Sequence, residues 1–137
     1  MKVLIVKLSS LGDVVHAMPA VQDIRAAHPD ALIDWVVEPA FAPLVRRVAG
    51  VNRVIECSLR RWRRGWWMPS VRAEWRAFRA ALQQEQYDAI IDLQGLTNGA
   101  RPNILAQRPA PVQVSYLGLP GTCALPRVDW IVADRYV

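Results

Sequence analysis

The sequence predicts an α/β fold, a three-layer Rossmann-like domain with a mostly parallel sheet. Apolar, β-branched segments alternate along the chain with segments whose apolar residues recur at helical spacing. Of the 137 residues, 53% are hydrophobic and 21% are charged. This composition supports a buried core and argues against a disordered chain. Because strands that alternate with helices make right-handed crossovers, we expect helices on both faces of the sheet.

The first predicted strand, residues 2–8, is apolar and β-branched without alternation. This pattern is typical of a strand buried on both faces of a parallel sheet. A small, polar turn at residues 9–13 ends the strand. The helix that follows is expected to run to about residue 27, because its apolar residues recur at helical spacing.

The next segments repeat this alternation. Residues 31–37 are predicted to form the second strand, and a short helix over residues 41–48 is expected to stop near Gly50. Residues 51–57 form the third predicted strand. Arginine- and tryptophan-rich residues then make an expected loop, after which Ser70 is the predicted N-cap of a helix to about residue 86.

The fourth predicted strand, residues 87–93, is again apolar. The remaining predicted elements are a short helix over 99–107, a strand over 112–117, a loop rich in Gly and Pro over 118–126 and a short strand over 130–133. No internal repeat or dividing linker is visible, so residues 1–137 are expected to form a single domain.

The net charge of +5 comes from one segment. Seven arginines lie between residues 60 and 79 against the single acid Glu74, so the rest of the chain sums to −1. The basic pI therefore reports a local patch and not a generally basic protein. Guanidinium groups bind phosphate and carboxylate groups in a bidentate manner, so Arg60, Arg61, Arg63 and Arg64 predict an anionic ligand. Arg72, Arg76 and Arg79 recur at helical spacing, and a solvated helix face is the alternative for them.

Cellular location and cysteine chemistry are also constrained. Apolar stretches fall short of the roughly 18 residues that a membrane span needs, and the start lacks a signal-peptide layout. A cytoplasmic location is expected. In that reducing compartment Cys57 and Cys123 are expected to be free thiols, and we assign them no role.

The turn at residues 9–13 is the first candidate site. It follows a strand's carboxyl end, where open α/β sheets bind ligands, and it leads into a helix. It lacks the Gly-x-Gly-x-x-Gly and P-loop patterns, which argues against nicotinamide and ATP binding. Asp13 has a simple alternative role as a helix cap on the N–H groups of Val15 or His16. Lys7 and His16 have structural or solvated roles as the simple expectation.

Four motifs resemble the N-terminal half of lipopolysaccharide heptosyltransferase I, in the same order. They are KLSSLGDVVH at 7–16, DWVVE at 34–38, RRWRR at 60–64 and IDLQGL at 91–96. The resemblance implies a GT-B glycosyltransferase, whose N-terminal lobe holds the acceptor, Kdo on lipid A, and whose C-terminal lobe holds ADP-heptose. No cofactor or metal is implied.

The resemblance also assigns site residues. It makes Asp13 the general base that takes a proton from the acceptor hydroxyl. It makes the turn and the arginine run the acceptor-binding residues: Ser9, Ser10, Gly12, Arg60, Arg61, Arg63 and Arg64. A lipid-linked acceptor implies a cytoplasmic protein with peripheral contact to the inner membrane.

The rest of the chain resembles a different family. The strings TNGARPNILAQRPAPVQV at 97–114, YLGLPGT at 116–122 and DWIVADRY at 129–136 are similar to bacterial relatives of the O-linked N-acetylglucosaminyltransferase. By that resemblance Leu117 and Gly118 would lie beside the donor sugar, and an ordinary Pro-Gly turn is the alternative. The sequence is thus interpreted as a chimera of two GT-B enzymes with a junction near residues 92–97. Engineered recombination is the preferred origin, and a natural fusion or a mis-assembled gene is the alternative.

Three functions remain open. The chain is an acceptor-side glycosyltransferase lobe, inactive alone because no C-terminal lobe binds the nucleotide sugar; or it is a folding module without activity; or its arginines and tryptophans bind nucleic acid. Since the heptosyltransferase resemblance accounts for the basic segment, nucleic acid is not the expected partner.

Overall fold

The computed structural model describes residues 1–94, 102–105, 109–116 and 128–132. Within them six strands form one sheet in the order β3-β2-β1-β4-β5-β6, and every neighbouring pair is parallel. The strands are β1 (Lys2–Val6), β2 (Leu32–Val37), β3 (Arg53–Glu56), β4 (Ala89–Asp92), β5 (Val112–Tyr116) and β6 (Trp130–Val132).

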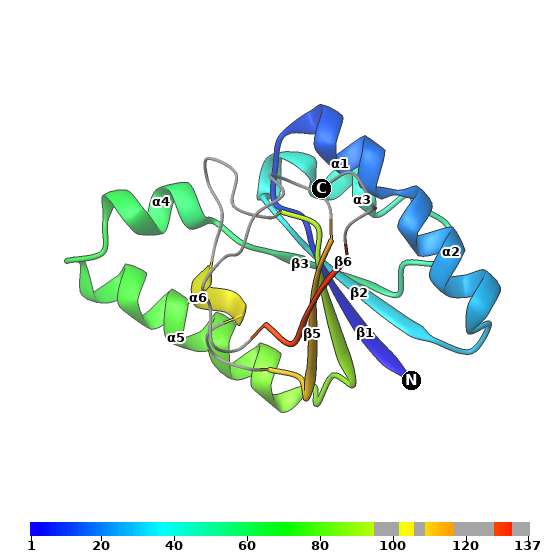
Figure 1. The fold of residues 1–137 in the computed structure, drawn as a ribbon. Helices are drawn as coiled ribbons and strands as arrows, with labels where there is room; N and C mark the ends of the chain where they lie inside the picture. Colours follow the sequence, from blue (N-terminus) through cyan, green and yellow to red (C-terminus); the bar gives the residue numbers. More distant parts are fainter. Residues whose placement is uncertain (95–101, 106–108, 117–127, 133–137) are drawn as a thin grey trace.

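Helices cover both faces of this sheet, as Figure 1 shows. One layer contains α1 (Leu11–Ala17), α2 (Pro19–Ala27), the 3-10 turn η1 (Pro39–Phe41) and α3 (Ala42–Val45). The other contains α4 (Leu59–Arg64), α5 (Pro69–Gln84) and α6 (Pro102–Leu105). The predicted three-layer α/β fold is confirmed.

Strand β1 lies at the centre of the sheet and supplies both hydrophobic cores. Its Leu4 and Val6 pack with α4, α5 and α6, whereas Ile5 packs with α1, α2 and α3. Successive side chains of a strand point to opposite faces, so an uninterrupted apolar strand fits only where both faces are covered. The apolar run that predicted the strand therefore also explains the two helical layers.

Two predicted helix boundaries are wrong. The helix expected to run to residue 27 is two helices, α1 and α2, because Pro19 lacks the N–H that would continue the hydrogen-bond ladder. Ser70 does not cap α5, since the helix begins at Pro69 with Met68 as its N-cap residue. Proline is well suited to a first helical position, where no N–H is needed.

The expected loop around Arg60, Arg61, Arg63 and Arg64 is also wrong, because these residues lie in α4. Arginine and leucine are good helix formers, and no glycine or proline interrupts the segment before Gly65. Trp62 anchors the inner face of the short helix, where it is buried against α5. The alternation of a buried tryptophan with exposed arginines is thus a helical pattern.

A polar cluster, buried at Asp34 and Tyr87, connects the strands near their amino ends. The Tyr87 hydroxyl donates to Asp34 Oδ2 at 2.7 Å, and Arg53 Nη2 donates to the same oxygen at 2.9 Å. Arg53 also pairs with Glu85 at 2.7 Å. Burial, and then the hydrogen bond to Asp34, raise the pKa of the Tyr87 hydroxyl, which therefore remains a donor. The cluster joins β2, β3 and the segment before β4.

We expect Tyr87→Phe to lower the free energy of unfolding by about 1.5–3 kcal/mol, because it removes a donor to a buried carboxylate. Urea denaturation measures the change. Tyr116 is exposed on β5, so Tyr116→Phe is a matched control that should stay within about 0.5 kcal/mol of the parent. Equal losses in the two variants would contradict the assigned role of the Tyr87 hydroxyl.

Candidate functional site

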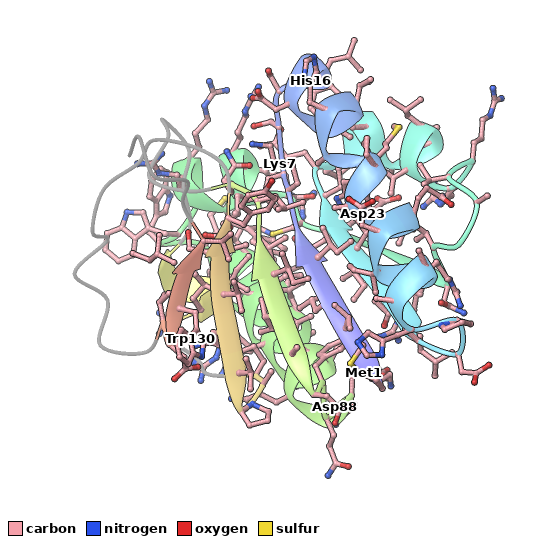
Figure 2. The ribbon with its side chains drawn as sticks, turned by 45° about the vertical axis from the view of Figure 1, so that its right-hand side comes forward. Met1, Lys7, His16, Asp23, Asp88 and Trp130 are labelled. Carbon is pink, nitrogen blue, oxygen red and sulfur yellow. The ribbon has the colours of Figure 1, made fainter. Side chains whose placement is uncertain are left out.

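The candidate site lies at the carboxyl edge of the sheet between β1 and β4. The strands that follow β1 in the chain, β2 and β3, lie on one side of it, and β4, β5 and β6 lie on the other. The direction in which strands are added to the sheet therefore reverses between β1 and β4. Open α/β sheets bind ligands at such a switch point, beyond the carboxyl ends of the strands. The predicted turn at residues 9–13 follows β1 at this edge (Figure 2).

Gln94 fixes the start of that turn. Its side-chain Oε1 accepts hydrogen bonds from the backbone N–H of Leu8 at 3.0 Å and from that of Ser9 at 3.4 Å. Its own N–H donates to Asp92 Oδ1 at 3.0 Å. Gln94 is buried, so the end of β4 holds the β1–α1 connection in place. Sequence reasoning gave Gln94 no such role, although it stood within the IDLQGL motif.

Asp13 lies in the first turn of α1 with an exposed side chain. Its Oδ2 accepts from the Ser10 N–H at 3.0 Å and from the Ser10 hydroxyl at 3.1 Å. The alternative role as a cap on Val15 or His16 is therefore wrong in its partner, because the carboxylate turns back to Ser10 and completes a capping box as a first-turn acid. These hydrogen bonds, from the backbone first and then the hydroxyl, lower the pKa of Asp13. Oδ1 makes no hydrogen bond to any described residue.

Lys7 adds a buried positive charge to this edge. Lys7 is 5% exposed, so of its two expected roles, structural or solvated, the solvated one is excluded. Burial lowers the pKa of Lys7, while the charges of Asp13 and Asp92 act in the opposite direction. The Trp35 Nε1–H donates to the Lys7 carbonyl at 3.1 Å, which fixes the backbone there. Figure 2 shows Lys7 at the end of β1 and His16 on the helix that follows.

The other predicted residues of the turn differ in their surroundings. Ser9 is half-buried and Ser10 is exposed. No atom lies within 4 Å of a Cβ built on Gly12, so the described residues leave open space beside that backbone. The turn thus presents a serine hydroxyl, open backbone and a carboxylate at one edge of the sheet.

Arg60 connects the basic helix to this edge. Its Nε lies 3.2 Å from Glu38 Oε1, and the Glu38 N–H donates to the Leu8 carbonyl at 3.1 Å. Because Leu8 is also the residue held by Gln94, α4 and the β1–α1 turn share one set of contacts. The structure therefore brings Arg60 to the switch point.

The four predicted arginines are not equivalent. Arg61 pairs with Glu74, whereas Arg63 and Arg64 form no ion pair within the part of the chain that the structure describes. Glu74 also accepts from Trp62 Nε1 at 2.9 Å. The hydrogen bond from Trp62, and then that from Arg61, lower the pKa of Glu74. Arg63 and Arg64 are thus the α4 arginines most available to a ligand.

Several sequence predictions lie outside the described residues. Leu117 and Gly118, predicted beside a donor sugar, are among them, as is Cys123. Cys57 is described and is buried in one core. Among residues 1–94, 102–105, 109–116 and 128–132, no three His, Cys, Asp or Glu side chains are grouped to hold a metal ion. No described helix is long and apolar enough to cross a membrane.

The fold and the switch-point site define a Rossmann-like lobe of the kind found in GT-B glycosyltransferases. Over 100 residues the chain is 52% identical to lipopolysaccharide heptosyltransferase 1 of Escherichia coli K12, covering 73% of this chain and 31% of that protein. The structure of E. coli heptosyltransferase WaaC with ADP superimposes with a TM-score of 0.73 at 45% identity, covering 85% of this chain and 36% of that chain.

A second glycosyltransferase family also matches. Glycosyl transferase family 41 matches residues 76–137. The probable UDP-N-acetylglucosamine–peptide N-acetylglucosaminyltransferase SEC of Arabidopsis thaliana is 45% identical over 56 residues, which covers 41% of this chain and 6% of that protein. Both predicted resemblances are confirmed. The chain spans about a third of the heptosyltransferases that it matches.

We expect Ser10→Ala to raise the pKa of Asp13, because it removes one of two donors that stabilise the ionised carboxylate. Carbon-detected NMR titration measures the change, and Ser58→Ala is the control because Ser58 makes no side-chain cap bond to its helix. Ionised Asp13 contributes to the free energy of unfolding at neutral pH, and this contribution is lost as the pH falls below about 4. An unchanged Asp13 titration would contradict the hydroxyl contact.

Proposed function

We propose that this chain is the acceptor-side lobe of a GT-B glycosyltransferase that resembles heptosyltransferase I. In this proposal the complete enzyme transfers heptose from ADP-heptose to Kdo on lipid A, and the lobe alone is inactive. The observation that carries the proposal is the exposed Asp13 carboxylate at the switch point, in a chain that is 52% identical over 100 residues to a heptosyltransferase. No metal or cofactor is part of the proposal.

Asp13 acts as the general base in this proposal. Its pKa is lowered by Ser10, so the carboxylate is ionised at neutral pH. Oδ2 is held by Ser10, which leaves Oδ1 to take the proton from the acceptor hydroxyl. The hydroxyl oxygen then bonds to the anomeric carbon of heptose while the bond to ADP breaks. Gln94 positions the base by holding the turn.

The basic residues bind the acceptor. Arg60 lies nearest the turn through Glu38, and Arg61, Arg63 and Arg64 extend the positive surface along α4. Guanidinium groups bind the phosphates and carboxylates of a Kdo-bearing lipid A. In this arrangement the acceptor sugar also contacts Ser9, Ser10 and Gly12 near its reacting hydroxyl. Leu117 and Gly118 lie toward the donor sugar, which a C-terminal lobe would hold.

The chain is proposed to be one domain, engineered by joining two GT-B lobes near residues 92–97. The family 41 match begins at residue 76, within α5, so similarity to that family extends upstream of this junction. A folding module without activity is the second candidate. A cytoplasmic location with peripheral contact to the inner membrane belongs to the same proposal.

Nucleic-acid binding has less support than it had from the sequence. It depends on tryptophans that interleave with arginines, but Trp62 is buried and Trp75 stacks on Phe78 at 5.7 Å. Base stacking needs accessible aromatic faces. Two of the four tryptophans in the basic segment are therefore committed to packing.

Transfer by a two-lobe enzyme tests the role of Asp13. The chain is fused to a heptosyltransferase C-terminal lobe, and heptose transfer from ADP-heptose to Kdo-bearing lipid A is measured. Asp13→Ala is expected to reduce turnover by about 10²- to 10⁴-fold, the usual contribution of a general base. Asp23→Ala, at an exposed site on α2 (Figure 2), should leave turnover unchanged. Retained turnover in Asp13→Ala would remove Asp13 from the mechanism.

Acceptor binding by the 137-residue chain tests the arginines separately. Arg63→Gln with Arg64→Gln should weaken binding of a deacylated, Kdo-bearing glucosamine bisphosphate by about tenfold or more, measured calorimetrically. The melting temperature should hardly change, because neither side chain has an ion pair in the described residues. Arg47→Gln on the opposite layer is the control. A binding constant that the double variant leaves intact, or no binding by the parent, favours the folding-module alternative.

A further inference from the structure

The turn between α4 and α5 carries an unusual exposed apolar cluster. Trp66 is 69% exposed, Trp67 is 63% exposed and Met68 is 47% exposed. We call these three residues the aromatic tip. Figure 1 shows this turn at the far left, away from the sheet. Large apolar side chains that are exposed next to one another usually indicate an interaction site, whereas single exposed apolar residues are common on any protein surface.

The tip is held in place by its neighbours. The Gly65 N–H donates to the Arg61 carbonyl at 3.1 Å, and the Met68 N–H donates to the Gly65 carbonyl at 2.8 Å. A Cβ on Gly65 would lie 3.1 Å from Val71 Cγ2, so the turn packs closely on α5. The exposed tryptophans therefore project from an ordered turn while Trp62, four residues earlier, is buried.

A hollow of about 210 Å³ lies beside the tip, and its lining is both apolar and cationic. It is lined by Leu59, Trp62, Arg63, Trp66, Val71, Arg72 and Trp75. Arg63 and Arg72 have no ion pair within the described ranges. An apolar floor with two guanidinium groups matches an amphiphile that has a short apolar segment next to an anionic head group.

The charged side chains around the aromatic tip are mainly positive. Arg64 and Arg76 lie nearby in sequence, and the nearest acid, Glu74, is engaged by Arg61 and Trp62. Tryptophan rings favour the water–lipid boundary because they combine a large apolar body with one polar N–H. Arginines beside such rings are attracted to anionic lipid head groups. The tip thus combines the two attractions that hold a protein at an anionic bilayer.

We propose that the aromatic tip docks on the surface of an anionic phospholipid bilayer, with Trp66 and Trp67 in the interfacial region and Arg72 on head-group phosphates. This inference rests on the peripheral membrane contact of the proposed function and deepens it, because it names the residues that make the contact. The bilayer itself is the ligand, and no Kdo is required. It also specifies which part of the chain faces the membrane. The Trp66 and Trp67 rings meet edge to face at 82°, which suits insertion side by side better than stacking on successive bases.

Vesicle co-sedimentation of the 137-residue chain tests the docking without any lipid A. Vesicles of phosphatidylglycerol mixed with phosphatidylethanolamine should bind the parent chain, and phosphatidylcholine vesicles should bind it weakly. Trp66→Ser with Trp67→Ser should weaken binding by roughly tenfold or more. Trp130→Ser is the matched control, because Trp130 is 68% exposed on β6 and should leave binding unchanged.

The charge contribution is tested with Arg72→Gln, which should weaken binding to the anionic vesicles about fivefold. Arg47→Gln on α3's layer should leave it unchanged. Quenching of tryptophan fluorescence by brominated lipid gives a second readout that needs no variant. The parent should be quenched in anionic vesicles, and the Trp66/Trp67 double variant should lose most of that quenching.

Four results would overturn the docking: no binding to anionic vesicles, equal binding to both vesicle types, equal losses in the tip and Trp130 variants, or no quenching in the parent. Tighter binding of single-stranded DNA, lost in the tip variant, would reassign the tip to nucleic acid. Acceptor binding is measured with a deacylated ligand, so its failure with vesicle binding intact would contradict only the acceptor-lobe proposal. Failure of vesicle binding alone would contradict the docking and the peripheral membrane contact, but not the acceptor-binding role of the lobe.

Discussion

Burial of β1 on both faces is the constraint on which the rest of this structure depends. Leu4 and Val6 face one core while Ile5 faces the other, so neither face of the strand tolerates solvent. Helices must then cross over on both sides, and right-handed parallel crossovers bring every strand's carboxyl end to the same edge. The polar turn after β1 lies at that edge for this reason, before any ligand chemistry is considered.

The elements that the sequence predicted well are those whose signal is local. The strands β1, β2 and β4 are mostly apolar runs that pair in parallel at the centre of the sheet. The break at Pro19 was not predicted because the helical spacing of apolar residues continues across it. The helical state of α4 was not predicted because a cluster of arginines and tryptophans is equally compatible with a loop. Asp13 was found through its motif, whereas its contact with Ser10 depends on the conformation of a single turn.

Long-range contacts at the site lay beyond sequence reasoning. Gln94 meets Leu8 across 86 positions of sequence, and Arg60 meets Glu38 across the ends of different elements. A pattern of residue types shows which positions are polar, but the pairing of those positions follows from sheet order. The division of the four α4 arginines into paired and unpaired members arises in the same way. Only the arrangement in space distinguishes Arg61 from Arg64.

The Gln94 contact has a consequence for exchanging parts between related enzymes. The backbone at Leu8 and Ser9, which leads to Asp13, is held by an amide that belongs to the segment around residues 92–97. If two related sequences are joined before Gln94, residue 94 comes from the second sequence. That residue then sets the conformation of the β1–α1 turn, although every residue of the turn comes from the first sequence. Segments joined at β4 can therefore preserve the hydrophobic packing of the sheet and still change the geometry of the turn that carries Asp13.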